Sequence, residues 1–360
     1  MPISQVPFAG ISNPVDFRNI VINGDMQIAQ RSTSVASITT SGYKTLDRFR
    51  FEIDSIGTFT MSQSTDTPTG QGFANSLKLD CTTADAAPAA GDLLQIVQRF
   101  EGQNLQYLKK GTANALPLTL SFWVKSTKTG TFIAELYDAN NTRQISKSYT
   151  VSVSNTWEFK TVTYAGDTTG AFTNDNGLSL VAVFWLGAGT TYTSGTLNTS
   201  WANATNANRA VGQVNIADNT ANDFLITGVQ LEAGEQASGF EFMPFDIDLI
   251  RCQRYYYLHA VGNGIRVGTA TAYSSALIDA TISFPTTMRT APSLIIASGT
   301  SYYRCYGNAT SDGVDDFSLL ETTANLTGFR NSTGFSGTQG YSYFINNDNA
   351  SSSIAFSAEL

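Results

Sequence analysis

The amino-acid sequence predicts an all-β protein: a jelly-roll β-sandwich followed by a smaller C-terminal β domain, with a short extended N-terminal arm. Three observations lead to this fold class. Apolar and polar residues alternate over short runs, turns rich in Gly, Asn, Thr and Ser separate the runs, and no internal repeat of fixed period appears. Alternation indicates half-buried strands, and many short strands are typical of sandwiches and jelly rolls. The missing repeat argues against a β-helix or a propeller.

The strands of the first domain are expected as separate short runs. Some of these runs alternate cleanly and others less so: Asp47–Ile53, Gly57–Gln63, Ser76–Thr82, Leu118–Lys125, Leu93–Phe100, Gly130–Tyr137 and Trp157–Tyr164. Leu178–Leu186 is almost continuously apolar, as expected of a strand buried on both faces. A helical turn is expected at Asn104–Lys110.

The stretch Asn222–Tyr257 opens as a strand and ends in an amphipathic run. Its alternation predicts one face with Leu225, Val229 and Leu231 and another with Phe224 and Ile226. Gly228 lies inside this strand and predicts a bulge. The run from Ile247 to Ile250 predicts a short helix or a tight connector, and a strand that leads into such a run marks a domain boundary.

We therefore predict three parts: an arm at residues 1–17, a jelly roll at residues 18–245 and a C-terminal β domain at residues 246–360. The arm carries three prolines and no periodicity, so a docking peptide and a disordered tail are both open. In the last part the expected strands are Ile265–Ala270, Ala276–Phe284, Ser293–Ala297, Phe317–Leu320, Tyr341–Asn346 and Ser353–Phe356.

Charge and composition exclude some classes of partner. Charged residues make up 14% of the chain, against roughly 25% in an average soluble protein. Hydroxyl and amide side chains must therefore cover much of the surface. The formal net charge is −8 and no basic run occurs, which argues against nucleic acid. The longest apolar run, Leu180–Leu186, is too short to span a membrane, and no membrane insertion is expected.

The cysteines bear on where the chain folds. Cys81, Cys252 and Cys305 are odd in number and far apart, which argues against a disulfide framework. Such a set suits folding in a reducing cytoplasm. Residues 1–18 have neither the basic nor the apolar region of a secretory signal.

The chain contains a series of separate phrases whose order and spacing are specific as a set: Asn19–Gln30, Leu46–Phe49, Leu120–Lys125, Gly195–Gln213, Phe224–Glu232, Phe240–Pro244, Cys252–Tyr256, Phe284–Pro292 and Phe356–Leu360. Together they resemble bacteriophage tail fibre proteins that carry a carbohydrate-binding-module-like jelly roll. The junction phrases FEFMP and CQRYY are the most specific. The chain lacks the long N-terminal shaft of many such proteins, which puts its mode of attachment in doubt.

The resemblance implies a homotrimeric virion protein of the phage tail, assembled in the bacterial host cytoplasm. Its implied partners are other tail or capsid proteins, reached through the N-terminal arm, and a glycan or protein of the host surface. We therefore expect adhesion to the host without catalysis. A head fibre or capsid decoration protein and a glycan-degrading tailspike stay as alternatives.

The sequence offers no clear catalytic motif, and no catalytic residue is assigned. His259 is the sole histidine and lies in an expected strand, where a structural role is favoured. Gly334–Gly337 does not have the spacing of a nucleophile elbow. Glycoside hydrolysis usually needs two opposed carboxylates, and 29 acidic residues always offer some pair by chance.

No cofactor is expected, and a structural calcium ion stays an alternative. Calcium prefers carboxylate and carbonyl oxygens. Asp25, Asp138–Asn141 and Asn174–Gly177 are rich in such oxygens, but none has the EF-hand spacing and plain turns have the same composition. No metal ligand is assigned.

Exposed aromatic rings are the candidates for receptor contact, because their faces pack against the apolar side of a sugar ring. Trp123 and Trp185 lie in apolar strands and are predicted to be core. The receptor-binding candidates are Trp157, Trp201, Tyr302, Tyr303, Arg304 and Tyr306. The competing interpretation of the tyrosine cluster is a trimer interface, where aromatic residues are also enriched.

Overall fold

The computed structural model describes residues 17–360, and these residues are nearly all β, as predicted. They divide into two compact units. The first comprises the residues up to Gln27, Val35–Gly42 and Arg50–Met243; the second comprises Ile28–Ser34, Tyr43–Phe49 and Pro244–Leu360. The predicted N-terminal arm lies outside the described residues except for Phe17. The predicted domain limits, residues 18–245 and 246–360, stay a prediction about independent folding.

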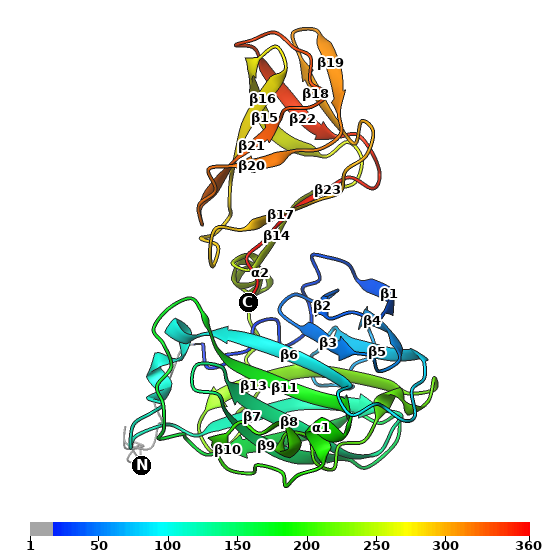
Figure 1. Ribbon diagram of the computed structural model, residues 1–360, viewed down its shortest axis with the longest axis vertical. Helices are drawn as coiled ribbons and strands as arrows, with labels where there is room; N and C mark the ends of the chain where they lie inside the picture. The colour runs from blue at the N-terminus through cyan, green and yellow to red at the C-terminus, as the bar shows by residue number, and fades with distance from the viewer. Residues whose placement is uncertain (1–16) are drawn as a thin grey trace, which may run out of the picture. The chain divides into compact units, whose positions relative to one another are not determined.

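The first unit contains two antiparallel sheets (Figure 1). One has six strands in the order β1 (Ser34–Ile38), β4 (Thr58–Ser64), β5 (Ser76–Thr83), β13 (Asp223–Ala233), β7 (Leu118–Ser126) and β10 (Glu158–Tyr164). The other has seven in the order β12 (Ala202–Asn203), β9 (Arg143–Val151), β8 (Gly130–Asp138), β11 (Leu178–Ala188), β6 (Leu93–Glu101), β3 (Arg50–Asp54) and β2 (Gly42–Tyr43).

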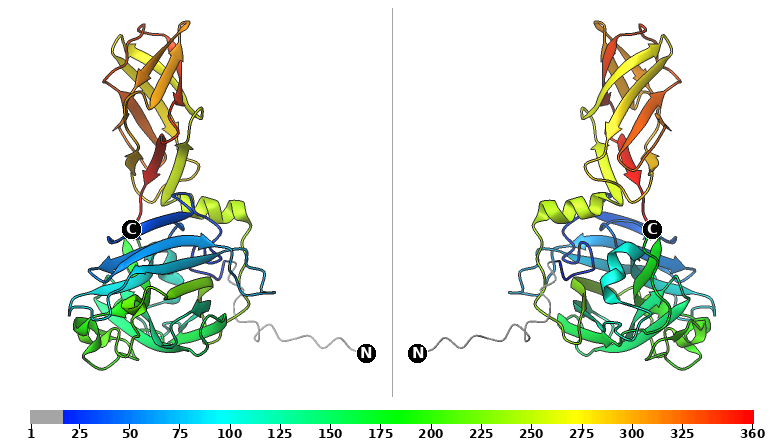
Figure 2. Two further views of the ribbon diagram at one scale, coloured as in Figure 1. Left: turned by 90° about the vertical axis from the view of Figure 1, so that its right-hand side faces the viewer. Right: turned by 90° about the vertical axis from the view of Figure 1, so that its left-hand side faces the viewer.

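Aromatic side chains from the two sheets meet between them and form the core of the sandwich. Phe122 on β7 lies 5.1 Å from Phe184 on β11, measured between ring centroids. Phe132 on β8 and Phe224 on β13 lie 5.8 Å apart. Because these pairs join one sheet to the other, the two sheets pack face to face as a β-sandwich. Figure 2 shows the strands from two further sides.

The strand β13 corrects one prediction about side-chain faces. Ile226 lies opposite Val124 and Leu231 lies opposite Leu120, and both partners share the core face of β7. The register shifts between Thr227 and Gln230, where Gly228 has a φ of +61°. The predicted bulge is therefore present. Its extra residue shifts the core-facing positions of β13 by one residue after Gly228. As a result Phe224 and Ile226 face the core together with Leu231, whereas the sequence analysis placed them on opposite faces.

Most of the expected strands of this unit are confirmed to within a few residues. The expected run from Asp47 becomes a strand only at Arg50, because Asp47 belongs to the second unit. The strand β9 was missed because polar residues dilute its apolar positions, Ile145, Tyr149 and Val151. Short helical turns complete the unit: η2 (Gly102–Leu108), α1 (Thr190–Thr193), η3 (Asn206–Asn208) and η4 (Ile216–Asp218).

The second unit holds one helix and two further antiparallel sheets. The helix is α2 (Phe245–Gln253), where the sequence predicted a helix or connector. A three-stranded sheet has the order β14 (Tyr256–Val261), β23 (Ser353–Ser357) and β17 (Ser293–Ile296). A seven-stranded sheet has the order β19 (Thr310–Val314), β18 (Tyr303–Gly307), β22 (Ser342–Asn347), β15 (Arg266–Ser274), β16 (Leu277–Ser283), β21 (Leu326–Asn331) and β20 (Ser318–Leu320).

Two N-terminal segments complete the second unit through buried charges near the end of the chain. Arg31 Nη2 donates to Glu359 Oε1 at 3.0 Å, and Arg48 also pairs with Glu359. The Arg48 guanidinium lies 3.4 Å from the ring centroid of Tyr255, and that of Arg31 lies 3.6 Å from Tyr256. These ion pairs and cation–π contacts hold residues 28–34 and 43–49 in the unit.

None of the helices within residues 17–360 has the length and apolar character needed to span a membrane.

Candidate functional site

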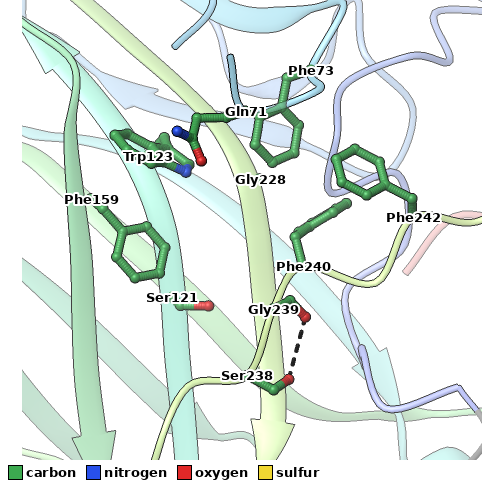
Figure 3. Close-up of a pocket in the computed structure, with 10 residues that line it drawn as sticks. All are labelled: Gln71, Phe73, Ser121, Trp123, Phe159, Gly228, Ser238, Gly239, Phe240 and Phe242. Atoms are coloured by element: carbon green, nitrogen blue, oxygen red, sulfur yellow. Dashed lines mark hydrogen bonds between the residues drawn. The ribbon is translucent and has the colours of Figure 1, made fainter. Parts of the chain in front are cut away.

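A pocket of about 260 Å³ lies on the first unit, on the face of the six-stranded sheet that points away from the core (Figure 3). Its lining comes from β7, β10 and β13, from the loop between β4 and β5, and from the segment after β13. The lining residues are Gln71, Phe73, Ser121, Trp123, Phe159, Gly228, Ser238, Gly239, Phe240 and Phe242. All of them belong to the first unit.

Trp123 and Phe159 form one wall of the pocket. They lie directly opposite each other on β7 and β10, and their ring centroids are 5.4 Å apart. Side chains alternate along a strand, so Trp123 points away from the core that its neighbours Phe122 and Val124 fill. The prediction that Trp123 is a core residue is wrong, whereas Trp185 is fully buried as expected. The alternation in LSFWVK was the signal that could have placed Trp123 on the outer face of its strand.

Three phenylalanines form the opposite wall, as Figure 3 shows. Phe73 comes from the loop between β4 and β5, while Phe240 and Phe242 follow β13. The three ring centroids lie between 4.9 and 5.1 Å apart. Phe73 is buried under the other two, and Phe242 leaves about half of its side chain exposed. The pocket therefore presents aromatic surface from two sides.

Gly228, the bulge residue of β13, lies between the two walls. A Cβ atom added there would come within 2.6 Å of Phe73 Cζ, closer than real Cβ contacts allow. Its φ of +61° also lies in the left-handed region that favours glycine. The bulge thus both sets the phase of β13 and makes room for the ring of Phe73.

A buried polar network holds the wall segment against the sheet. Glu232 accepts hydrogen bonds from Ser238 N at 2.8 Å and from Ser238 Oγ at 2.7 Å. Gln230 Oε1 accepts from Glu241 N at 2.8 Å. Gln230 and Glu232 project from β13 on the face away from the core, so they fix the segment that carries Phe240 and Phe242.

The pocket also offers hydrogen-bonding groups without charge. The side chains of Gln71 and Ser121 make no hydrogen bond within residues 17–360. None of the ten lining residues is acidic or basic. An amide and a hydroxyl beside aromatic faces can recognise hydroxyl groups on a partly apolar ligand. The same lining does not supply the two opposed carboxylates that glycoside hydrolysis usually requires.

The tryptophan candidates of the sequence analysis lie elsewhere on the first unit, and both are half-buried. Trp157 Nε1 donates to Asp66 Oδ1 at 2.9 Å. Trp201 Nε1 donates to the carbonyl of Ala165 at 2.7 Å. Neither lines the pocket. Their role in receptor contact stays a prediction.

The tyrosine cluster of the second unit lies on and just before β18. Tyr303 is fully buried, and its hydroxyl donates to the carbonyl of Ala297 at 2.6 Å, so its ring is part of the core. Tyr306 is 39% exposed. Arg304 is partly exposed and its Nε donates to Asp348 Oδ2 at 2.6 Å. Tyr302 is half-buried against the core. Of the four, Arg304 and Tyr306 keep surface on which a partner could bind.

In one of the oxygen-rich loops considered for calcium, Asp138–Asn141, the carboxylate of Asp138 lies against a lysine ammonium. Lys110 Nζ lies 2.5 Å from Asp138 Oδ2, 3.1 Å from Asp167 Oδ2 and 2.7 Å from the carbonyl of Gly170. Asp175 Oδ1 accepts a hydrogen bond from the backbone N–H of Gly177, so this segment is a plain turn. Within residues 17–360, no group of three or more His, Cys, Asp or Glu side chains is placed to hold a metal ion.

Asp25, the third calcium candidate, is buried, and burial raises the pKa of its carboxyl. Gln27 Nε2 donates to this carboxyl.

The sole histidine has both ring nitrogens engaged. His259 Nε2 lies 2.7 Å from the carbonyl of Val267, and Nδ1 lies 3.0 Å from the hydroxyl of Tyr257. Burial lowers the pKa of His259, which favours the neutral ring. These contacts describe a structural side chain within the second unit.

Comparison with known proteins found no protein-family model that matches the sequence. No curated protein matches it either.

Solved structures resemble the chain only remotely. One is the enzymatically active domain of tailspike protein 4 of bacteriophage CBA120, 16% identical over 61% of this chain and 22% of that chain, with a TM-score of 0.32. Another is a putative sugar binding protein of Bacteroides thetaiotaomicron VPI-5482, 13% identical over 60% of this chain and 100% of that chain, with a TM-score of 0.33. A third is TmCBM61 in complex with β-1,4-galactotriose, 12% identical over 60% of this chain and 99% of that chain, with a TM-score of 0.30.

These similar structures thus include a phage tailspike domain and a carbohydrate-binding module. At such TM-scores the likeness carries no functional assignment, and the fold rests on the strand pairing described above. The resemblance to tail fibre proteins stays a prediction.

Proposed function

We propose that this protein is a bacteriophage tail fibre adhesin that binds a glycan of the bacterial surface in the aromatic pocket of its first unit. The observation that carries the proposal is the pocket itself, with aromatic walls on two sides and an unbonded amide and hydroxyl between them. Carbohydrate rings have apolar faces edged by hydroxyl groups. Trp123 and Phe159 would pack on such a face while Gln71 and Ser121 bind hydroxyls.

The size and chemistry of the pocket favour a short, neutral part of a glycan. Pockets for drug-sized ligands usually hold roughly 300–1,000 Å³, and this pocket holds about 260 Å³. A single sugar residue of a longer chain is therefore the ligand that fits it best. Since no lining residue is charged, a neutral sugar is preferred over an acidic one at this place.

The role on the particle rests on the sequence resemblance. In this proposal the protein is a homotrimer of the phage tail, docks to tail or capsid proteins through residues 1–17 and binds its receptor without cleaving it. The pocket supports binding rather than catalysis because it contains no acid or base.

The test is glycan binding by the full-length protein, by two pocket variants and by one control variant outside the pocket. An array of bacterial surface polysaccharides identifies a ligand, and calorimetry then measures its affinity. Loss of an aromatic stacking contact costs roughly 0.5–1.5 kcal/mol, so Trp123→Ala and Phe159→Ala should each weaken binding about two- to twelvefold. Tyr273→Ala, which removes an exposed ring of the second unit outside the pocket, should bind as the wild type does. Binding that survives Trp123→Ala unchanged, in a protein with native circular dichroism, would refute the proposed site.

Two further measurements separate this role from its alternatives. Purified protein should compete with adsorption of particles that carry this chain, whereas a capsid decoration protein would not compete. Immunogold labelling should mark the tail rather than the head. Incubation with the bound polysaccharide should release no reducing ends, because their release would identify a glycan-degrading tailspike.

A further inference from the structure

Exposed aromatic and arginine side chains gather on one face of the seven-stranded sheet in the second unit. Phe344 on β22 is 52% exposed, and Tyr306 on β18 is 39% exposed. Arg266 on β15 is exposed, and its guanidinium carbon lies 4.2 Å from the ring centroid of Phe344. Large apolar groups gathered on a surface usually mark an interaction site.

The strand register arranges these residues in two adjacent rows. Asn346 on the central strand β22 lies opposite Arg304 on one side and opposite Arg266 on the other. In the next row Phe344 lies opposite Tyr306. Residues directly opposite in a sheet point to the same face, and neighbouring strands are about 4.8 Å apart. The two guanidinium-bearing positions are thus separated by roughly 10 Å across the sheet, with an amide between them.

The charges of this face are not balanced. Arg304 uses its Nε for Asp348 and keeps both Nη groups unbonded within residues 17–360. Arg266 has no carboxylate partner among the described residues, and its guanidinium lies over the ring of Phe344. The side chain of Asn346 makes no hydrogen bond within the same residues. Guanidinium groups with free N–H edges are suited to bind carboxylates in a bidentate manner.

We propose that this face is a second glycan-binding site, specific for an acidic sugar such as a uronic acid. Arg266 and Arg304 bind the carboxylate, and Tyr306 with the exposed part of Phe344 contacts the ring. Two guanidinium groups with free N–H edges beside exposed aromatic rings match a sugar that carries a carboxylate, which is why an acidic sugar is the ligand proposed here. The inference does not depend on the neutral pocket of the first unit, since the two sites share no residue.

The experiment uses the full-length protein and two acidic polymers, polygalacturonate and polyglucuronate, each beside its methyl ester. Esterification keeps the sugar and removes the charge, so it isolates the contribution of the carboxylate. Affinity electrophoresis should show retention by at least one acid polymer and at least fivefold weaker retention by its ester. Arg266→Gln and Phe344→Ala should each weaken binding to the acid at least fivefold. Arg18→Gln, an exposed arginine of the first unit, is the matched control and should leave binding unchanged.

Three results would overturn the inference. The wild-type protein could bind neither acid polymer, it could bind acid and ester equally, or it could bind as well after Arg266→Gln as before. A trimer that dissociates in Arg266→Gln and Phe344→Ala during light scattering, with unchanged acid binding, would assign this face to contact between copies. The variant Trp123→Ala should keep acid binding, so failure of the neutral pocket is distinguishable from failure of this site.

Discussion

The ammonium group of Lys110 lies 2.5 Å from Asp138 Oδ2, and both side chains are almost completely buried. Asp167 and the carbonyls of Thr169 and Gly170 complete the oxygen shell. The rings of Phe172 and Trp201 lie 5.1 and 5.5 Å from Nζ. One lysine therefore gathers several loops of the sandwich around a single positive charge.

Replacing this lysine should strongly destabilise the first unit. Lys110→Met would leave Asp138 buried opposite a side chain that cannot pair with it, and breaking a buried ion pair costs about 3–5 kcal/mol. Chemical denaturation followed by tryptophan fluorescence measures the change. The neighbouring exposed residue provides the control, since Lys109→Ala should shift stability by less than about 0.5 kcal/mol. Equal stability of both variants would contradict the role of the buried charge.

Gly228→Ala should cost more than its φ angle alone explains. Gly228 and Gly70 both have positive φ, +61° and +78°, but an added Cβ meets Phe73 only at Gly228. Strain of φ alone costs about 1 kcal/mol, so Gly70→Ala measures that contribution. Overpacking against Phe73 should add about 1–3 kcal/mol in Gly228→Ala. Thermal unfolding of the two variants compares their losses of stability. Equal losses would mean that the ring of Phe73 moves aside without cost.

The carboxyl of Asp47 should make the stability of the second unit fall as the pH rises. Burial raises the pKa of Asp47 from 3.8 to about 7, against the opposing charge of Arg31. Between pH 4 and pH 7 the folded state then binds more protons than the unfolded state, so this group loses stabilising free energy with rising pH. Denaturation midpoints across this range should fall for the wild type relative to Asp47→Asn. The control Asp54→Asn, at an exposed position, should show the same pH dependence as the wild type. A wild-type midpoint that rises with pH relative to that of Asp47→Asn would contradict the predicted direction.

The three cysteines should be unreactive in the folded protein. All of them are buried and free, and burial raises the pKa of Cys81 to about 11 and that of Cys305 to about 12. Burial also raises the pKa of Cys252. Since the thiolate is the reactive form, a chromogenic disulfide reagent should detect no thiol at pH 8 until denaturant is added, and three thereafter. Rapid reaction of any thiol in the native protein would show that its unit opens locally.

Much of the fold follows from local alternation, and the exceptions have physical causes. Strands such as β5 and β7 were predicted because every second residue is apolar and faces the core. The faces of β13 were assigned wrongly because one extra residue at Gly228 shifts the period of two. A bulge can be expected from a glycine, but its effect on phase appears only when the partner strand is known.

The pocket could not be predicted as a unit. Phe73, Trp123 and Phe240 are far apart in sequence, and they meet only through the pairing of β13 with β5 and β7 and through the loop before β5. Unless the order of the strands in the sheet is known, the sequence does not show that these residues are neighbours. The burial of Tyr303 beside the exposed Tyr306 is different, because alternation along β18 already separates the two faces once the strand is recognised.

The interleaving of the chain between the two units constrains any exchange of the C-terminal part with that of another protein. A chimera joined at residue 244 would transplant Glu359 without Arg31 and Arg48, which the recipient would have to supply from its own N-terminal sequence. The transferable cassette is therefore discontinuous: residues 28–34 and 43–49 have to travel with the C-terminal part.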